Sequence, residues 1–213
     1  MARTKLKRFS KLNDLKNVFN INKTDVKESL KNFFNENNRF TLEIGCGHGD
    51  YSIELAQKFH NRNFIGIDVK GARVYNGAMK ALEMNIENVA FILTKAQRLN
   101  EIFEQKSIEE IYLPFPDPHV RRKNQERRLV SRSFLTLYQK LLIDSGLLHL
   151  KTDDSGLFDY AIKSITNSAG KILHISEDLY NDETSELNFG IITSFEKHFI
   201  NEGRKIKYIC FRF

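Results

Sequence analysis

The stretch that most constrains the fold lies at residues 41–50, Thr-Leu-Glu-Ile-Gly-Cys-Gly-His-Gly-Asp. Apolar residues lead into it as in a buried strand, and an acid, Glu43, stands near the end of that strand. Glycine accepts positive φ and has no Cβ, so the chain can turn sharply here and approach a ligand closely. A helical pattern follows at once, and a loop that enters a helix N-terminus presents N–H groups to a polar or anionic ligand.

The spacing of Gly45, Gly47 and Gly49 restricts which ligand this could be. A phosphate loop would end in Gly-Lys-Ser/Thr, which is absent. The dinucleotide fingerprint needs its third glycine three residues after the second, where this chain has Asp50. The order acid-x-Gly-x-Gly-x-Gly resembles the first motif of doubly wound S-adenosylmethionine-dependent methyltransferases. A tight turn that binds nothing is the alternative.

The composition is that of a single globular domain. The chain has 213 residues, of which 41% are hydrophobic, enough for one sizeable core. No apolar run is long enough to cross a membrane, and no secretory signal is expected. The two cysteines, Cys46 and Cys210, show no zinc or disulfide spacing. We therefore expect a reduced, cytoplasmic protein with no metal and no membrane partner.

The net charge of +6 is unevenly distributed. Residues 1–22 contain six basic residues and one acid, and residues 121–128 contain a second basic run. Basic clusters on an otherwise nearly neutral body predict a polyanionic partner. For residues 1–22 alone, a solvated lysine-rich surface is an equally good interpretation.

Strand and helix patterns alternate along the chain. The segments that have the pattern of strands are residues 41–44, 63–68, 89–93, 108–115, 146–152, 172–176 and 205–213. Apolar residues at helical spacing lie between most of them, and an earlier short helix is expected at residues 25–34. This alternation predicts a single-domain, doubly wound α/β fold with a mostly parallel sheet covered on both faces. Residues 1–38 are expected to be a basic extension whose first twenty residues are mobile, and residues 39–213 the domain.

A second acid, Asp68, ends the second expected strand, 25 residues after Glu43. A βαβ unit places a carboxylate here that can accept both hydroxyls of a ribose. Capping of the next helix before Lys70 is another role for the same side chain, and both can hold.

All three prolines fall within five residues, in Leu-Pro-Phe-Pro-Asp-Pro at residues 113–118. Each proline fixes its own φ and biases the preceding residue toward extended geometry. We therefore expect Leu113, Phe115 and Asp117 to be extended and stiff. Such a segment can present one ring and one carboxylate in fixed positions, and a rigid connection without function is the alternative.

Taken in order, these motifs, together with Thr-Asp at residues 152–153 and Thr-Ser-Phe-Glu at residues 193–196, resemble the bacterial tRNA (guanine-N7)-methyltransferases of the TrmB family. The resemblance runs from about Phe40 to the C-terminus. It implies a class I, Rossmann-like methyltransferase with a seven-stranded sheet and an antiparallel last strand. It also implies S-adenosylmethionine as methyl donor and a guanine in the tRNA variable loop as substrate. We expect no obligate protein partner, and a monomer or homodimer.

The resemblance assigns roles position by position. The cofactor-binding positions are Glu43, Gly45, Gly47, Gly49, Asp68, Lys95, Ala96 and Asp117, and Asp117 is also the expected catalytic residue. The substrate-binding positions are Arg121, Asp153, Thr193, Ser194, Phe195 and Glu196. The RNA-contacting positions are Lys123, Asn124, Gln125, Glu126, Arg127 and Arg128. Two positions differ from the family pattern: His119 replaces a common tryptophan, and Lys95 replaces an acid near the adenine, where backbone groups of Lys95 and Ala96 are the expected substitute.

Chemistry at guanine N7 needs no base, because N7 carries a lone pair and no proton. Alignment should dominate catalysis, with Asp117 accepting hydrogen bonds from the guanine edge and Asp153 and Glu196 assisting. Two alternatives remain. The proline-flanked acid is also similar to the Asn/Asp-Pro-Pro-aromatic motif of amino-methylating enzymes, and a nonenzymatic RNA-binding module could keep this fold. A nicotinamide dehydrogenase is disfavoured by the glycine spacing.

Overall fold

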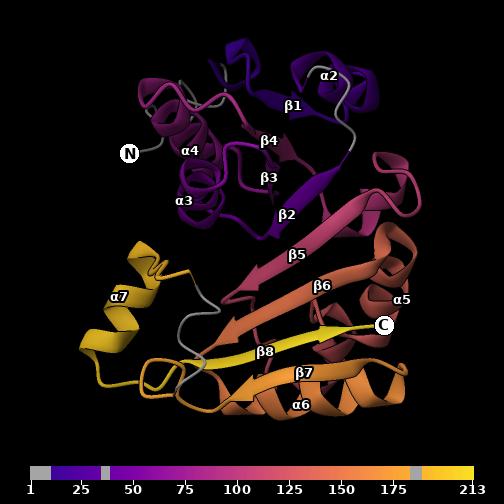
Figure 1. Ribbon diagram of the computed structural model, residues 1–213, viewed down its shortest axis with the longest axis vertical. Coiled ribbons are helices and arrows are strands. Elements are labelled where there is room, and N and C mark those ends of the chain that lie inside the picture. Colours follow the sequence, from indigo (N-terminus) through magenta and orange to yellow (C-terminus); the bar gives the residue numbers. More distant parts are fainter. Residues whose placement is uncertain (1–10, 35–38, 183–188) are drawn as a thin grey trace.

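The computed structural model describes residues 11–34, 39–182 and 189–213. These residues form one eight-stranded sheet in the order β1-β4-β3-β2-β5-β6-β8-β7 (Figure 1). The strands are β1 Val18–Asn20, β2 Phe40–Ile44, β3 Asn63–Asp68, β4 Val89–Leu93, β5 Ile108–Pro114, β6 Leu142–Thr152, β7 Lys171–Ser176 and β8 Lys207–Arg212. Pairs from β1 through β6 are parallel, and β8 is antiparallel to both β6 and β7. The doubly wound sheet and the antiparallel last strand are confirmed, but the predicted seven strands are one too few.

The additional strand, β1, comes from the segment expected to be mobile. Val18 pairs with Phe91 of β4, and Leu12, Val18 and Phe19 are all buried. Part of the predicted extension therefore belongs to the sheet. Three strand residues in a polar context give too short a pattern to predict from the sequence. Residues 1–10 lie outside the described residues.

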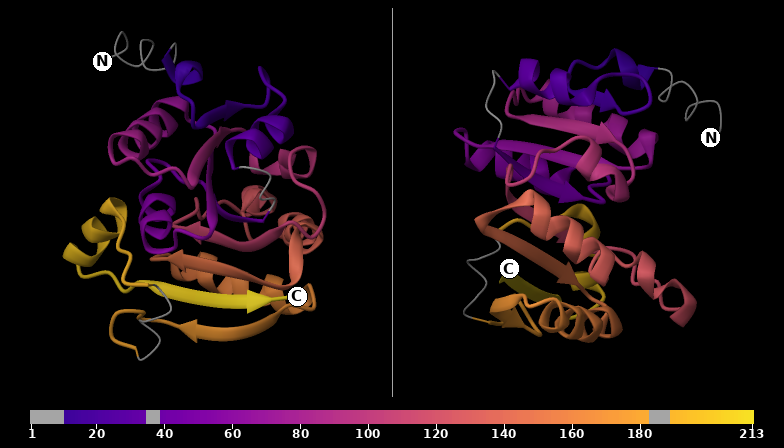
Figure 2. Two further views of the ribbon diagram at one scale, coloured as in Figure 1. Left: turned by 45° about the horizontal axis from the view of Figure 1, so that its top comes forward. Right: turned by 90° about the vertical axis from the view of Figure 1, so that its right-hand side faces the viewer.

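Helices cover both faces of the sheet, as Figures 1 and 2 show. They are α2 Val26–Phe33, α3 Asp50–Lys58, α4 Gly71–Glu83, α5 Arg132–Leu141, α6 Ser155–Asn167 and α7 Ser194–Asn201, with 3-10 helices η1 Leu12–Asp14, η2 Ala96–Glu101 and η3 Arg122–Arg127. Side chains of α3 and α4 share one buried cluster, and those of α2, α5 and α6 share another. None of the helices in the described part of the chain has the length and apolar character needed to cross a membrane.

The alternation of side chains along β2 separates core from site. Phe40, Leu42 and Ile44 join the cluster beneath α2, α5 and α6, so Glu43 faces the opposite side. From β2 the chain proceeds outward through β3 and β4, then returns to place β5 on the other side of β2. The carboxyl ends of β2 and β5 therefore flank the point where strand order reverses, which is where doubly wound sheets hold their ligands. The yellow α7 stands beside these strand ends and close to α3 (Figures 1 and 2).

Replacing Phe19 tests whether β1 belongs to the cooperative fold. Phe19 is 8% exposed, and its ring meets that of Phe33 edge to face at a centroid distance of 5.8 Å. Phe19→Ala should lower the free energy of unfolding by about 3 kcal/mol, measured by urea denaturation. Lys16→Ala, an exposed substitution two residues before β1, should change it by less than about 0.5 kcal/mol. Equal effects of the two variants would show that β1 is detached in solution.

Candidate active site

A cleft of about 530 Å³ opens at the carboxyl ends of β2 and β5. It is lined by Glu43, Gly45, Cys46, Gly47, His48, Asp50, Arg73, Pro114, Phe115, Thr193, Ser194, Phe195 and His198. Its size lies within the range of small-molecule sites. Three segments that are distant in sequence build its walls: the glycine loop, the start of the proline segment and the first turn of α7.

The glycine loop has the backbone that its composition predicts. Gly45, Gly47 and Gly49 have φ of 79°, 57° and 69°, a region that residues with a Cβ rarely adopt. A Cβ on Gly45 or Gly47 would enter open space, whereas one on Gly49 would lie 2.4 Å from the ring of Phe91. Gly49 is thus required by packing, and the other two glycines leave room on the cleft side.

The loop's amides are less available than expected. Those of Gly45 and Cys46 donate to the Ile67 carbonyl at 2.8 and 3.0 Å, and that of Gly47 donates to Asp68 Oδ2 at 2.9 Å. The prediction of free N–H groups is wrong for these three, because the end of β3 closes the turn.

Asp68 therefore shapes the loop. Its Oδ1 also accepts from the Lys70 amide at 2.8 Å. Lys70 is the N-cap of α4, and no side chain of the described residues caps this helix, so the predicted capping role of Asp68 is wrong. Carboxylate oxygens accept more than one bond each, so the ribose role stays a prediction. Lys95 is exposed at the end of β4, before η2, and neither it nor Ala96 lines the cleft. Their cofactor roles also stay predictions.

Glu43 forms the floor of the cleft. Its carboxylate is buried, and its Oε2 accepts from the Ser52 amide at 2.8 Å and the Ser52 hydroxyl at 2.6 Å. Ser52 lies in the first turn of α3, so the acid satisfies a helix N-terminus. Burial raises the pKa of Glu43 from 4.5 to about 8; the Ser52 bonds oppose that rise, and the charges of Asp50 and Asp68 add to it.

Pro114 and Phe115 supply the second wall. Phe115 has φ of +50°, so the prediction that it is extended is wrong. Its amide donates to the Lys151 carbonyl of β6 at 2.8 Å, and its ring lies 5.7 Å from that of Phe199. These contacts hold a conformation that the following Pro116 alone would disfavour.

Asp117 is not among the cleft-lining residues. Its side chain is 71% exposed, and its Oδ1 accepts from the His119 amide at 2.9 Å. The carboxylate lies two residues beyond Phe115 and is open to solvent. Its catalytic and cofactor roles therefore stay predictions.

The first turn of α7 is the third wall. Thr193 and Glu196 form a capping box, with the Thr193 hydroxyl accepting from the Glu196 amide and the Glu196 side chain accepting from the Thr193 amide. Ser194 donates to Asp50 Oδ2 from its hydroxyl and, at 3.1 Å, from its amide. Phe195 is 58% exposed, with its ring 6.1 Å from that of Phe115.

Two expected substrate contacts are already paired within the protein. Glu196 is fully buried, with its Oε1 2.6 Å from Lys151 Nζ. Asp153 Oδ2 lies 2.8 Å from Arg204 Nη1. The structure differs from the expectation for Glu196, because a carboxylate at zero exposure cannot meet a base without rearrangement of α7.

The basic segment divides in two. Arg121, Lys123 and Arg127 are exposed at η3, as RNA contacts require. Arg128 is buried; its Nε donates to the Pro118 carbonyl at 2.8 Å, and its guanidinium lies 4.4 Å from the centre of the Tyr160 ring. Arg128 therefore helps to hold the segment in place, and its contact with RNA stays a prediction.

Sequence reasoning missed several residues of the site. Asp50, Arg73 and His198 line the cleft without a local pattern that would identify them. Lys151 could have been recognised from the sequence. It lies in the apolar run of β6, and a lysine that is buried there must have a partner for its charge.

A family model described as "putative methyltransferase" matches residues 37–209. A tRNA (guanine-N(7)-)-methyltransferase of Christiangramia forsetii is 35% identical over 99% of this chain and 98% of its own length. The enzyme of the same name from Cytophaga hutchinsonii is 36% identical over 100% of this chain and 99% of its own.

The chain belongs to the tRNA (guanine-N(7)-)-methyltransferase family. Solved structures extend the likeness of fold beyond this family. An antibiotic-related methyltransferase shares 19% identity at a TM-score of 0.63, covering 87% of this chain and 92% of that one. The 16S rRNA methyltransferase KamB shares 11% at a TM-score of 0.65, covering 86% and 91%. Among the residues that the structure describes in this family member, no group of three or more His, Cys, Asp or Glu could hold a metal ion.

The raised pKa of Glu43 predicts a pH dependence of stability. Between pH 4.5 and about 8 the folded protein holds a proton that the unfolded chain has lost. The contribution of Glu43 to the free energy of unfolding should therefore fall as pH rises, by at most about 1.4 kcal/mol per unit. Glu43→Gln removes this contribution.

Urea unfolding at pH 5.5 and 7.5 would measure the difference between wild type and Glu43→Gln. The exposed Glu87→Gln is the matched control, and it should keep the wild-type slope. A wild-type slope in the Glu43→Gln variant would contradict the buried, protonated carboxyl.

Proposed function

We propose that this protein transfers the methyl group of S-adenosylmethionine to N7 of a guanine in the variable loop of tRNA. The observation that carries the proposal is the cleft at the strand reversal, where a glycine loop above a buried acid faces an exposed phenylalanine ring. The family relationship supports the same reaction. A tRNA substrate would be met in the cytoplasm.

The residues of the cleft fit a cationic cofactor. Three acids, Glu43, Asp50 and Asp68, surround the glycine loop, and the charges of the other two raise the pKa of Glu43. A nearby positive charge would favour its ionised form. The open space beside Gly45 and Gly47 gives room for a ligand. S-adenosylmethionine supplies a methyl group activated by a sulfonium charge.

The protein's part in the reaction is alignment. Guanine N7 forms the new bond to carbon with its own lone pair, so no side chain has to remove a proton. Holding the two reacting groups in line can contribute roughly 7–11 kcal/mol. The pre-formed walls of the cleft, the glycine loop, Phe115 and Phe195, suit this task.

The RNA side of the cleft offers stacking and charge. Phe195 presents an open ring face beside Phe115, and stacking of a base on an aromatic side chain is worth about 1–3 kcal/mol. Its ring could stand in for the tryptophan that His119 replaces. We assign Thr193, Ser194 and Asp153 to the same side. Arg121, Lys123 and Arg127 would hold phosphates, and the neighbouring Asn124, Gln125 and Glu126 stay predicted RNA contacts.

The identity of the methylated base decides the function. Unmodified tRNA should accept labelled methyl from S-adenosylmethionine, and nuclease digestion should give N7-methylguanosine from the variable loop. Methylation should also weaken with salt, because phosphate contacts release counterions. An N2- or N6-methylated base would indicate the amino-methylating alternative. No transfer and no cofactor binding by calorimetry would indicate the nonenzymatic one.

Asp117→Ala separates the base side from the cofactor side. We expect loss of methyl transfer by about 100-fold or more with cofactor affinity retained, since the carboxylate lies outside the cleft lining. Glu109→Ala removes a half-buried carboxylate on β5, away from the cleft, and is the control for the loss of a negative charge. If Asp117→Ala also abolishes cofactor binding, its assignment to the guanine is wrong.

A further inference from the structure

Lys151, the penultimate residue of β6, holds two walls of the cleft. Its backbone carbonyl accepts from the Phe115 amide at 2.8 Å. Its side chain ends 2.6 Å from Glu196 in the first turn of α7. Lys151 therefore binds the backbone of Phe115 directly, and its side chain contacts the helical turn that carries Phe195. Phe115 and Phe195 are the two rings of the cleft.

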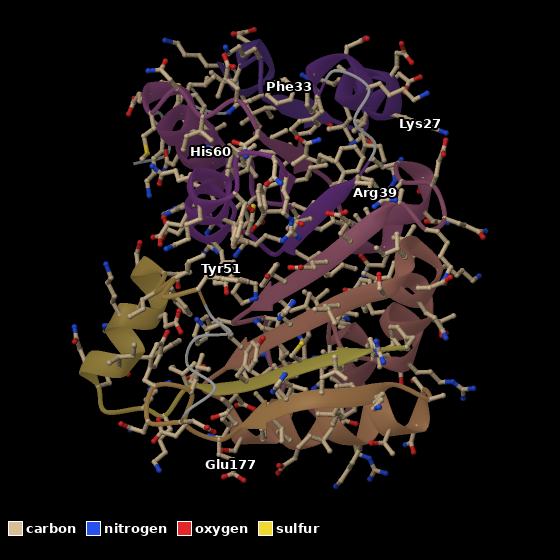
Figure 3. The ribbon with its side chains drawn as sticks, in the orientation of Figure 1. Lys27, Phe33, Arg39, Tyr51, His60 and Glu177 are labelled. Carbon is tan, nitrogen blue, oxygen red and sulfur yellow. The ribbon has the colours of Figure 1, made fainter. Side chains whose placement is uncertain are left out.

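The ammonium group of Lys151 is enclosed by acceptors. Its side chain is 3% exposed, and Nζ lies 3.3 Å from the Tyr180 hydroxyl and 3.3 Å from the Ile191 carbonyl, in addition to the Glu196 carboxylate. The rings of Tyr51 and Tyr180 lie at 5.5 and 5.7 Å. Tyr51 belongs to the first turn of α3 and is labelled in Figure 3. One buried cation thus joins β6, α3 and the segment that leads into α7.

Glu196 has matching surroundings. Oε1 accepts from the Tyr180 hydroxyl at 2.6 Å and meets Lys151, while Oε2 accepts from the Thr193 amide at 3.2 Å. Both oxygens are engaged and the residue has no exposed surface. A buried ion pair is weak evidence for stability, but these contacts restrict where the first turn of α7 can lie. Here that segment carries Ser194 and Phe195, and the Ser194–Asp50 bond fixes its other side to α3.

We propose that Lys151 is a positioning residue for the target nucleotide, and that Glu196 is its buried counter-ion and makes no contact with RNA. This inference rests on the proposed function. The pair sets where Phe195 stands relative to the glycine loop, and Lys151 sets Phe115 through its carbonyl. The cofactor side of the cleft depends on other bonds, those of Glu43 with Ser52 and of Asp68 with Gly47.

A double-mutant cycle tests the proposal in the full-length protein. Lys151→Met and Glu196→Leu each leave one buried charge without its partner, whereas the double variant removes both. The measurements are melting temperature, S-adenosylmethionine affinity by calorimetry, and kcat and KM for tRNA at a temperature where circular dichroism shows each variant folded. Lys106→Met, which breaks the exposed pair with Asp144 at the far end of β5 and β6, is the matched control.

We expect Lys151→Met to lower kcat/KM for tRNA by about tenfold or more while cofactor affinity stays at the wild-type value. The double variant should melt higher, and transfer methyl faster, than Glu196→Leu alone. Recovery of melting temperature without any recovery of transfer would show that the Glu196 carboxylate touches the substrate, and would overturn the proposal. So would an unchanged kcat/KM in folded Lys151→Met.

Tyr180→Phe covers the case in which Lys151→Met does not fold. It removes one hydroxyl from the pair and no charge, so it should reduce kcat/KM for tRNA in the same direction and by less. Wild-type kinetics in that variant would contradict the inference. A wild-type protein that transfers no methyl to tRNA would instead refute the proposed function, so the two failures are distinguishable.

Discussion

The parallel pairing of β2 with β5 is the constraint on which the site depends. Register places Glu43 beside Tyr112, so the glycine loop after β2 and the proline segment after β5 leave the sheet next to each other. The chain reaches these two strands more than sixty residues apart, and only the reversal of strand order brings them together. α7 then closes the third side through contacts to both β6 and α3.

Charge is sorted across this cleft. The acids Glu43, Asp50 and Asp68 gather at the glycine loop, while the exposed cations Arg121 and Arg127 follow the proline segment. A positively charged small molecule and a polyanion would thus each meet surface of opposite sign. Burial of Glu43 keeps a proton on that side when no cation is present, which limits the cost of three neighbouring acids.

Much of this arrangement follows from the sequence because it rests on local rules. Glycine spacing predicts the positive-φ loop, the Thr-x-x-Glu pattern predicts the start of α7, and apolar periodicity predicts seven of the eight strands. The errors occur where tertiary contacts decide. Glu196 and Arg128 look like surface charges in the sequence, and only packing against β6 and Tyr160 makes them interior. Three-residue β1 is recognised only by its partner, β4.

The backbone conformation of Phe115 lowers stability at a position that lines the cleft. A phenylalanine at φ of +50° is held at a local disadvantage of roughly 1–2 kcal/mol, which asparagine or glycine would largely relieve. A substitution selected only for heat tolerance would therefore favour loss of the ring that lines the cleft. The ring at this position therefore comes at the expense of thermal stability.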